Sequence, residues 1–204
     1  LMTLAVSKFL SATLLKGVPS SFTLELPPYR RPQLGKVIVR SIFDRTLFVL
    51  GRAASVAAPA GLIIWLLANI HAGGDTLLAH CAGFLDPFAR VFGLDGVILL
   101  AFILGLPANE IVIPLIIMAY LSQGSLVELS DLTALRSLLI DNGWTWVTAL
   151  CVMVFSLMHW PCSTTCLTIK KESGSWKWTA AAVAIPTVCG LILCFLIANA
   201  CRLL

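Results

Sequence analysis

The feature that most constrains this chain is an apolar segment, residues 97–121, that is long enough to cross a membrane but is interrupted in its middle. The interruption is the run Gly-Leu-Pro-Ala-Asn-Glu at residues 105–110, and a further proline, Pro114, follows it. Glu110 places a carboxylate at membrane depth, where a charge is costly unless it faces a protein interior or a water-filled cavity. Backbone opened by glycine and proline needs the same shelter. The segment therefore predicts a site for something that crosses the membrane.

Composition identifies the class of protein. Of the 204 residues, 59% are hydrophobic and 12% are charged, whereas soluble domains carry about 25% charged residues. Several apolar runs approach or exceed the roughly 20 residues that cross a ~30 Å hydrocarbon core. We therefore expect an all-α, polytopic transmembrane helical bundle in a lipid bilayer. The net charge of +4 does not indicate nucleic-acid binding, because most cations lie in short clusters that flank apolar spans.

Apolar runs and the connectors between them divide the chain into four parts. The predicted parts are the end of a truncated membrane helix (1–16), a cytoplasmic Pro-rich and basic amphipathic segment (17–45), a unit with one span and the interrupted segment (46–122, with the span at 46–70 and the interrupted segment at 94–121), and an external connector with two closing membrane helices (123–204). The closing helices are expected at 144–160 and 179–201.

Charge in the connectors predicts their side of the membrane. The connectors 16–45 and 168–178 are rich in Lys and Arg, and the connectors 71–93 and 122–143 are net acidic. The positive-inside rule places the first pair in the cytoplasm and the second pair outside. Both flanks of residues 94–121 then lie on one side, so we expect a re-entrant, broken-helix hairpin that turns near residues 105–107. Residues 71–93 are expected to form a loop with helical pieces.

Within the hairpin, Glu110 and Asn109 are the candidate metal ligands. A half-helix that ends at Gly105 directs free carbonyls into the turn, and Pro107 suits the first position of the second half-helix. Carboxylate, amide and carbonyl oxygens are hard ligands that suit a divalent cation losing its water. The alternative is that Glu110 and Asn109 only cap the broken backbone. Carboxylates in membranes are rarely retained for packing, which favours ligation.

A second interruption is predicted at Pro161, which cannot donate a backbone hydrogen bond and clashes with the carbonyl of Leu157 in a helix. Cys162 stands directly after this proline and is the principal sulfur candidate for the metal site. Thiolate is a soft ligand that suits a borderline metal such as Fe(II). The sequence therefore predicts an opened helix with a thiol at the opening.

Weaker candidate ligands lie near the same proline: Met158, His159 and Cys166. At ~100° per residue, Cys151, Met158 and Cys162 fall on one helix face. Ordinary core packing is the alternative explanation for this sulfur stripe, since free Cys and Met are common core residues. For His159, the alternative is a hydrogen bond to a local carbonyl.

Enzyme classes receive little support. Ser156 and His159 lie three residues apart, but no acid partner or oxyanion motif accompanies them. No phosphate-binding loop of the GxxxxGKS/T type occurs in the sequence, so this chain is not expected to hydrolyse nucleotide. The seven cysteines are odd in number and lie mostly in apolar spans, which argues against a secreted disulfide framework. We expect a transporter without a resident cofactor.

Four sequence elements carry a family resemblance. They are Leu-Pro-Pro-Tyr-Arg at 26–30, the interrupted run at 105–110, Trp-Pro-Cys-Ser-Thr-Thr at 160–165 and Lys-Lys-Glu-Ser-Gly-Ser-Trp-Lys-Trp at 170–178. In this order, and spread over most of the chain, they resemble the C-terminal half of the membrane domain of the bacterial ferrous iron transport protein B (FeoB) family.

The resemblance implies uptake of Fe²⁺ across the bacterial inner membrane through two gate-type repeats, of which residues 46–122 correspond to the second. It implies a first gate repeat and a cytosolic GTP-binding domain, which uses GTP and Mg²⁺, ahead of this chain, and small cytosolic accessory proteins as partners. Cys162 matches the family's gate cysteine, which is proposed to line the iron path. Asn109 and Glu110 correspond to the cysteine-bearing turn of the first repeat. Cys166 receives no role from the resemblance.

Other functions stay open. A gate-fold transporter of another solute, such as a nucleoside or a different divalent metal, should show more hydrogen-bonding side chains and fewer thiols. A non-transporting membrane scaffold predicts that Glu110→Ala and Cys162→Ala leave metal uptake unchanged. A membrane redox enzyme that uses His159 and the thiols predicts absorbance from a haem or a flavin.

Overall fold

The structure is a computed structural model that describes residues 2–13, 35–36, 39, 43, 46–126, 129 and 131–203. The chain divides into two units, Leu1–Arg40 and Ser41–Leu204. In the first unit, helix α1 (Met2–Thr13) lies where the sequence predicts the end of a helix. The predicted Pro-rich and basic amphipathic segment at 17–45 lies outside the described residues, apart from a few isolated positions.

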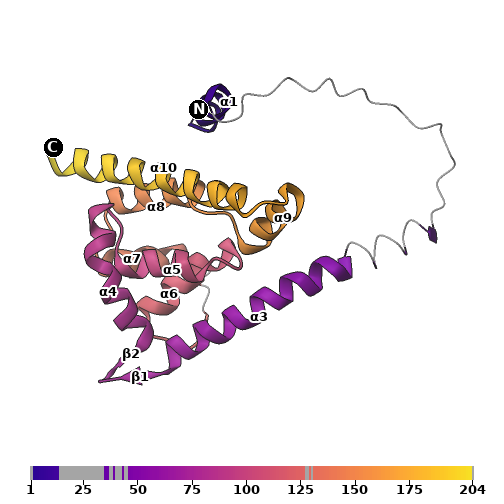
Figure 1. Ribbon diagram of the computed structural model, residues 1–204. Helices are drawn as coiled ribbons and strands as arrows, with labels where there is room; N and C mark the ends of the chain where they lie inside the picture. The colour runs from indigo at the N-terminus through magenta and orange to yellow at the C-terminus, as the bar shows by residue number, and fades with distance from the viewer. Residues whose placement is uncertain are drawn as a thin grey trace. The chain divides into compact units, whose positions relative to one another are not determined.

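The second unit is almost entirely helical over its described residues (Figure 1). Its elements are α3 (Phe48–Asn69), β1 (His71–Ala72), β2 (Asp75–Thr76), α4 (Leu77–Val91), α5 (Gly96–Leu104), the 3₁₀ turn η2 (Asn109–Ile111), α6 (Val112–Tyr120), α7 (Leu132–Asp141), α8 (Trp146–Met158), α9 (Ser163–Ser173) and α10 (Trp176–Leu203). The predicted all-α class is confirmed.

Three segments of the described chain are long and apolar enough to cross a membrane: Val49–Asn69, Trp146–Ser173 and Trp176–Arg202. A fourth candidate is the pair α4–α5, which is bent by 108°. Helices α3, α8 and α10 thus lie where the sequence analysis expects spans. The polytopic membrane class follows from these apolar lengths.

Two connectors hold more helix than the sequence predicts. Residues 71–93, expected as a loop with helical pieces, form a β-hairpin and then the 15-residue helix α4. Gly73 and Gly74, with φ of +70° and +105°, make the two-residue turn. A glycine pair is also common in loops, so the sequence favoured a loop here. The sequence did not predict the full length of helix α4. Its buried face is formed largely by small residues, including Ala82 and Ala89, which give a weak hydrophobic pattern. The acidic connector 122–143 likewise contains α7.

Residues 94–121 fold back on themselves, and the predicted broken-helix hairpin is confirmed. Helix α5 begins after Asp95, whose carboxylate accepts a hydrogen bond from the backbone N–H of Ile98 at 2.6 Å. Helix α6 ends at Tyr120, whose hydroxyl donates to the other carboxylate oxygen of Asp95. The end of α6 therefore lies beside the start of α5, and the chain reverses direction between them.

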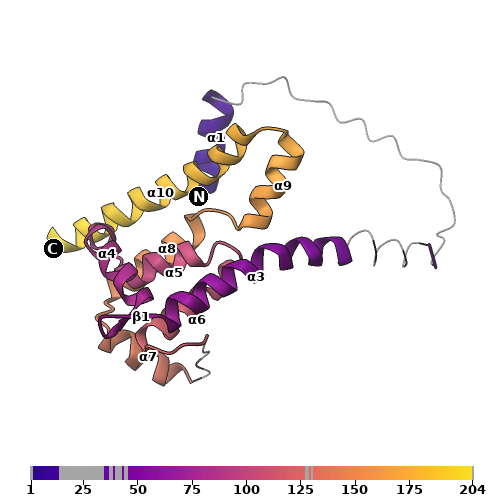
Figure 2. The ribbon, with the colours of Figure 1, turned by 60° about the horizontal axis from the view of Figure 1, so that its bottom comes forward.

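This hairpin is the most buried part of the described chain, and other helices cover it. Ile98 and Phe102 of α5 and Leu115 of α6 are at most 1% exposed. Phe102 packs edge-to-face on Phe155 of α8, with ring centroids 4.8 Å apart. Figure 1 shows α8 lying beside α10, and Figure 2 shows α9 turning back toward the start of α10.

Close approach between helices depends on a glycine at the α4–α5 corner. A Cβ atom built on Gly96 would lie 1.9 Å from the carbonyl oxygen of Ala82. The backbone N–H of Gly96 also donates to the Asp86 carboxylate at 3.1 Å. Because lipid is as apolar as a helix face, packing of this kind, made possible by small residues, holds membrane helices together.

Candidate functional site

The two interruptions that the sequence singles out meet in space. The backbone N–H of Ser163, the first residue of α9, donates to the carbonyl oxygen of Leu106 in the hairpin turn, with an N···O distance of 2.9 Å. This bond satisfies one of the N–H groups that every helix leaves free at its start. The turn at 105–108 and the opened chain at 159–162 are thereby brought to one place.

A glycine allows the hairpin turn to close. The N–H of Gly105 donates to Ala101 O at 2.8 Å, and the N–H of Ala108 donates back to Gly105 O at 3.0 Å. A Cβ atom on Gly105 would lie 2.6 Å from Cγ2 of Val112, so a larger residue would push the two half-helices apart. Pro107 lies within the turn, not at the first position of the second half-helix as expected, because Ala108 is extended and η2 begins after it.

Asn109 and Glu110 occupy η2, just after the turn, and both are exposed. Neither side chain caps η2, whose preceding residue Ala108 is fully extended and makes no side-chain cap. This geometry disfavours the interpretation that the two residues only cap broken backbone. The carboxylate of Glu110 and the amide of Asn109 are exposed to the surroundings of the turn, and their role as metal ligands stays a prediction.

The second interruption has the predicted form. Helix α8 ends at Met158, His159 is extended with ψ 177°, and Cys162 is extended with ψ 157° before α9 begins. The Cys162 sulfur lies 3.1 Å from the hydroxyl oxygens of both Thr164 and Thr165. The thiol and the two hydroxyls form one compact polar group at the start of α9.

Thr164 and Thr165 were not singled out from the sequence. Hydroxyl residues are ordinary at the start of a helix, so their type alone carries little signal. Their place within three residues after a Pro-Cys pair in an apolar region is the signal that was available. A cysteine at a helix start, followed by hydroxyl residues, gathers several metal-ligand atoms on one turn.

The predicted sulfur stripe is wrong in its geometry. Cys151 is fully buried, and its sulfur lies 3.8 Å from the carbonyl oxygen of Cys194 in α10. Met158 also faces α10, where its Cβ would lie 2.9 Å from a Cβ built on Gly190. Because the chain is extended after Met158, Cys162 does not continue the helical face of these residues. Cys151 is a packing residue between two helices.

His159 presents one ring nitrogen to the opened segment. Its Nδ1 lies 2.9 Å from the carbonyl oxygen of Ser156. A carbonyl only accepts, so in the neutral ring Nδ1 carries the proton and Nε2 keeps its lone pair. The hydrogen bond to a local carbonyl, which is the alternative explanation for His159, therefore exists, and Nε2 is the nitrogen that keeps a lone pair.

Three buried polar atoms within the described chain have no hydrogen-bond partner, and all three lie at this interruption: His159 Nε2, Trp160 Nε1 and Ser163 Oγ. Unpaired buried polar atoms are uncommon in folded proteins and mark places where water or an ion completes the structure. Polar atoms without a protein partner therefore gather at the interruption that meets the hairpin turn.

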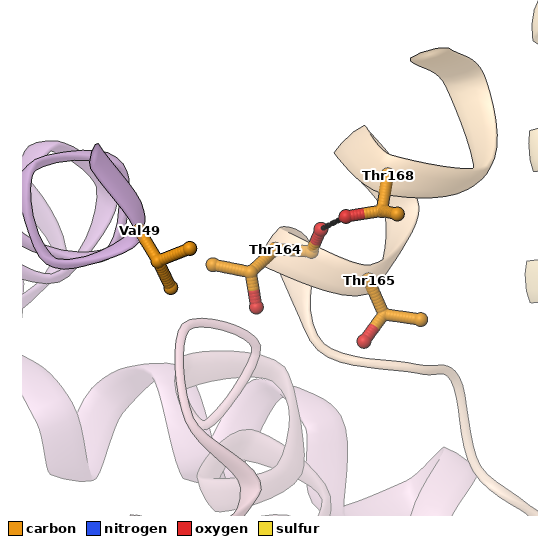
Figure 3. Close-up of a pocket in the computed structure, with 4 residues that line it drawn as sticks. All are labelled: Val49, Thr164, Thr165 and Thr168. Atoms are coloured by element: carbon orange, nitrogen blue, oxygen red, sulfur yellow. Dashed lines mark hydrogen bonds between the residues drawn. The ribbon is translucent and has the colours of Figure 1, made fainter. Parts of the chain in front are cut away.

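A cavity of ≈ 310 Å³ adjoins the start of α9 (Figure 3). Val49 of α3 forms one wall, and Thr164, Thr165 and Thr168 form the other. Thr168 donates its hydroxyl proton to Thr164 O at 2.9 Å. Water occupies about 30 Å³ per molecule in the liquid, so the cavity has room for a divalent cation with a full shell of water. Cys162 does not line the cavity itself, but its sulfur lies 3.1 Å from the hydroxyls of two lining residues, Thr164 and Thr165.

The candidate ligands do not form a closed metal cage. In the part of the chain that the structure describes, no three His, Cys, Asp or Glu side chains gather around one point. The Cys166 thiol donates to the carbonyl oxygen of Pro161 at 3.5 Å. What the structure brings together are the Cys162 thiol, two threonine hydroxyls and the carbonyl-rich hairpin turn.

Comparison with known proteins gives two family matches. Residues 50–176 match the family described as Gate: nucleoside recognition, and residues 1–44 match the family described as ferrous iron transport protein B C terminus. No solved structure matches the chain.

Curated relatives match nearly the whole chain. An Fe(2+) transporter FeoB from Staphylococcus aureus (strain COL) is 31% identical, over 96% of this chain and 29% of the relative. One from Methanocaldococcus jannaschii is 26% identical, over 89% of this chain and 28% of the relative. A Porphyromonas gingivalis protein, named as a fusion of Fe(2+) transport protein A and Fe(2+) transporter FeoB, is 22% identical, over 97% of this chain and 29% of the relative. The chain thus spans less than a third of the length of these relatives.

Proposed function

We propose, on the premise that this chain belongs to the Gate family and matches the C-terminal membrane portion of FeoB, that it forms one half of an Fe²⁺ pathway in a bacterial inner membrane. The relatives that cover almost all of it are named Fe(2+) transporters. The observation that carries the proposal is the hydrogen bond between Ser163 and Leu106, because it joins the two interruptions that hold the candidate ligands.

In this proposal, Fe²⁺ exchanges water for protein ligands in steps. Asn109 and Glu110 offer oxygen after the hairpin turn, and Cys162 offers sulfur at the start of α9. Fe²⁺ is a borderline cation and accepts both kinds of ligand, as well as the imidazole nitrogen of His159. Conduction needs ligands that bind strongly enough to admit the ion and weakly enough to release it. An open set of scattered ligands suits passage better than a closed cage does.

The rest of the transporter is expected in the longer parent protein. We propose that the parent supplies the first gate repeat and a cytosolic GTP-binding domain that hydrolyses GTP with Mg²⁺. One relative is named as a fusion with Fe(2+) transport protein A, which supports a small accessory protein as a partner. This chain itself is proposed to carry no resident cofactor and to catalyse no reaction.

The test is anaerobic uptake of ⁵⁵Fe²⁺ by cells that produce the full-length parent, with Glu110→Gln and Cys162→Ser as separate variants. Matched controls are Glu172→Gln, at an exposed carboxylate on α9, and Cys189→Ser, at a thiol on α10. We expect each site variant to lower uptake at subsaturating Fe²⁺ about tenfold, which corresponds to roughly 1.4 kcal/mol of lost binding.

Normal uptake in both site variants, at equal expression, would remove the site assignment and favour the scaffold alternative. Uptake of radiolabelled uridine, measured in parallel, tests the nucleoside alternative that the Gate family's description raises. We expect no uridine uptake above that of cells without the protein.

A further inference from the structure

Three side chains from three segments form a hydrogen-bonded chain at the end of the hairpin opposite its turn. The Trp144 indole Nε1 donates to the Tyr120 hydroxyl oxygen at 2.8 Å. The Tyr120 hydroxyl donates to the carboxylate of Asp95. We call Asp95, Tyr120 and Trp144 the base clamp, because Asp95 starts α5, Tyr120 ends α6 and Trp144 precedes α8.

The direction of each bond in the base clamp is fixed by chemistry. An indole N–H only donates and an ionised carboxylate only accepts, so the phenol between them must accept from Trp144 and donate to Asp95. The second oxygen of Asp95 already accepts from the N–H of Ile98. Within the clamp, the Tyr120 hydroxyl is the partner of both the Trp144 indole and the Asp95 carboxylate. Loss of the phenol oxygen therefore breaks both bonds at once.

Further bonds hold the same end of the hairpin to α4, and α4 to α10. Asp86 of α4 accepts from the N–H of Gly96 and pairs with Arg90 at 2.6 Å. The guanidinium of Arg202, near the end of α10, donates to the carbonyl oxygen of Arg90 at 2.5 Å. The base of the hairpin is therefore tied to α4 through Asp86 and to the segment before α8 through Trp144, and α4 is tied in turn to α10.

The turn end has fewer hydrogen bonds to its neighbours among the described residues. It meets the Pro-Cys interruption through the backbone bond from Ser163 to Leu106 and through the rings of Phe102 and His159, whose centroids lie 5.1 Å apart, beside the three unpaired polar atoms of 159–163. Helix α5 has nine residues and is about 13 Å long at 1.5 Å per residue. A tilt of about 5° at the base therefore moves the turn by about 1 Å, enough to break a hydrogen bond.

We propose that Tyr120 is a positioning residue: through the base clamp it sets the angle of the hairpin, so that the turn meets the interruption at Cys162. The base is the fixed pivot, and the turn is the end that moves when the pathway opens. The pathway in this statement rests on the proposed function, whereas the effect of Tyr120 on the environment of Cys162 does not.

The experiment uses the full-length parent in membrane vesicles and needs no iron. Vesicles are treated with N-ethylmaleimide, and mass spectrometry follows the modification rate of Cys162 relative to that of Cys189. The variants are Tyr120→Phe, Trp144→Phe and their double variant. Trp146→Phe is the matched control, because Trp146 lies two residues away and is 70% exposed.

We expect Tyr120→Phe to raise the Cys162 to Cys189 ratio about five- to tenfold, as the loss of its two hydrogen bonds predicts when each makes a small net contribution. Trp144→Phe should raise it less, because the bond from Tyr120 to Asp95 remains. The double variant should equal Tyr120→Phe, since the indole has no acceptor once the hydroxyl is gone. Trp146→Phe should leave the ratio unchanged.

An unchanged ratio in Tyr120→Phe, with or without a loss of folded protein, would overturn the proposal, because a purely stabilising role alters the amount of protein and not this ratio. Additive effects in the double variant would overturn it as well. If Tyr120→Phe does not assemble, Trp144→Phe carries the test alone, and a ratio equal to that of Trp146→Phe refutes the clamp. Normal iron uptake in the Glu110 and Cys162 variants would remove the proposed function and leave this result standing.

Discussion

Replacing Ser163 with proline removes the N–H group that joins the opened segment to the hairpin turn. Ser163 is the first residue of α9, a position where proline is well tolerated because its N–H makes no bond within the helix. Cys162 already has φ −60° and ψ 157°, the extended geometry that proline requires of the residue before it. The substitution should therefore leave α9 intact and act on the contact with Leu106 alone.

The size of the effect follows from the contact itself. A hydrogen bond of this kind contributes about 0.5–1.5 kcal/mol net. The proline ring also places a carbon near the direction in which the N–H pointed, and Leu106 O lies only 2.9 Å from the nitrogen. The turn must retreat by a fraction of an ångström. Together these terms weaken the contact by about 1–2 kcal/mol, or roughly 5- to 30-fold in the ratio of closed to open forms.

The assay is maleimide modification of Cys162 in the full-length parent, with ⁵⁵Fe²⁺ uptake measured alongside. Ser163→Ala is the control, since it keeps the N–H and removes only the hydroxyl. We expect faster modification of Cys162 and altered uptake in Ser163→Pro and neither change in Ser163→Ala. If the two variants behave alike, the contact between the turn and the opened segment does not control access to Cys162.

Three further predictions concern packing and ligation. Gly96→Ala should destabilise the purified parent by about 2–3 kcal/mol, because the added carbon would lie 1.9 Å from Ala82 O; an unchanged melting temperature in detergent would contradict the packing. Cys151→Ala should leave the KM for Fe²⁺ unchanged, since this sulfur is buried against α10. A raised KM would indicate that Cys151 contacts Fe²⁺ and would contradict its role as a packing residue. His159→Asn keeps a donor for Ser156 O and deletes Nε2; we expect weaker uptake at low Fe²⁺ with normal thermal stability, and normal uptake would exclude Nε2 as a ligand.

The hairpin was predictable because its causes are local. Gly105 and Pro107 interrupt an apolar run, and the positive-inside rule, applied to the acidic connectors on both sides, predicts that the chain returns. The opening at Pro161 was predictable for the same reason, since a proline in the interior of a helix removes a backbone hydrogen bond and clashes with the preceding turn. Such breaks are properties of a few neighbouring residues.

The contacts made by these breaks were not predictable. The bond from Ser163 to Leu106 and the base clamp join residues far apart in sequence. A polar residue at the end of an apolar run can be recognised, but the sequence does not show which distant residue it bonds to. The sulfur stripe failed because it assumed that α8 continued through Pro161. Asp95, directly before an apolar run, carried a usable signal as a helix cap, but nothing pointed to Tyr120 as its partner.

The central claim is that the hairpin turn and the Pro-Cys interruption form one Fe²⁺ site. Its most direct test is protection of Cys162 from maleimide by Fe²⁺, in anaerobic proteoliposomes of the full-length parent. We predict that Fe²⁺ slows modification of Cys162 but not of Cys189, and that Glu110→Gln weakens this protection. Equal modification of Cys162 with and without Fe²⁺, or protection that does not depend on Glu110, would contradict a shared site.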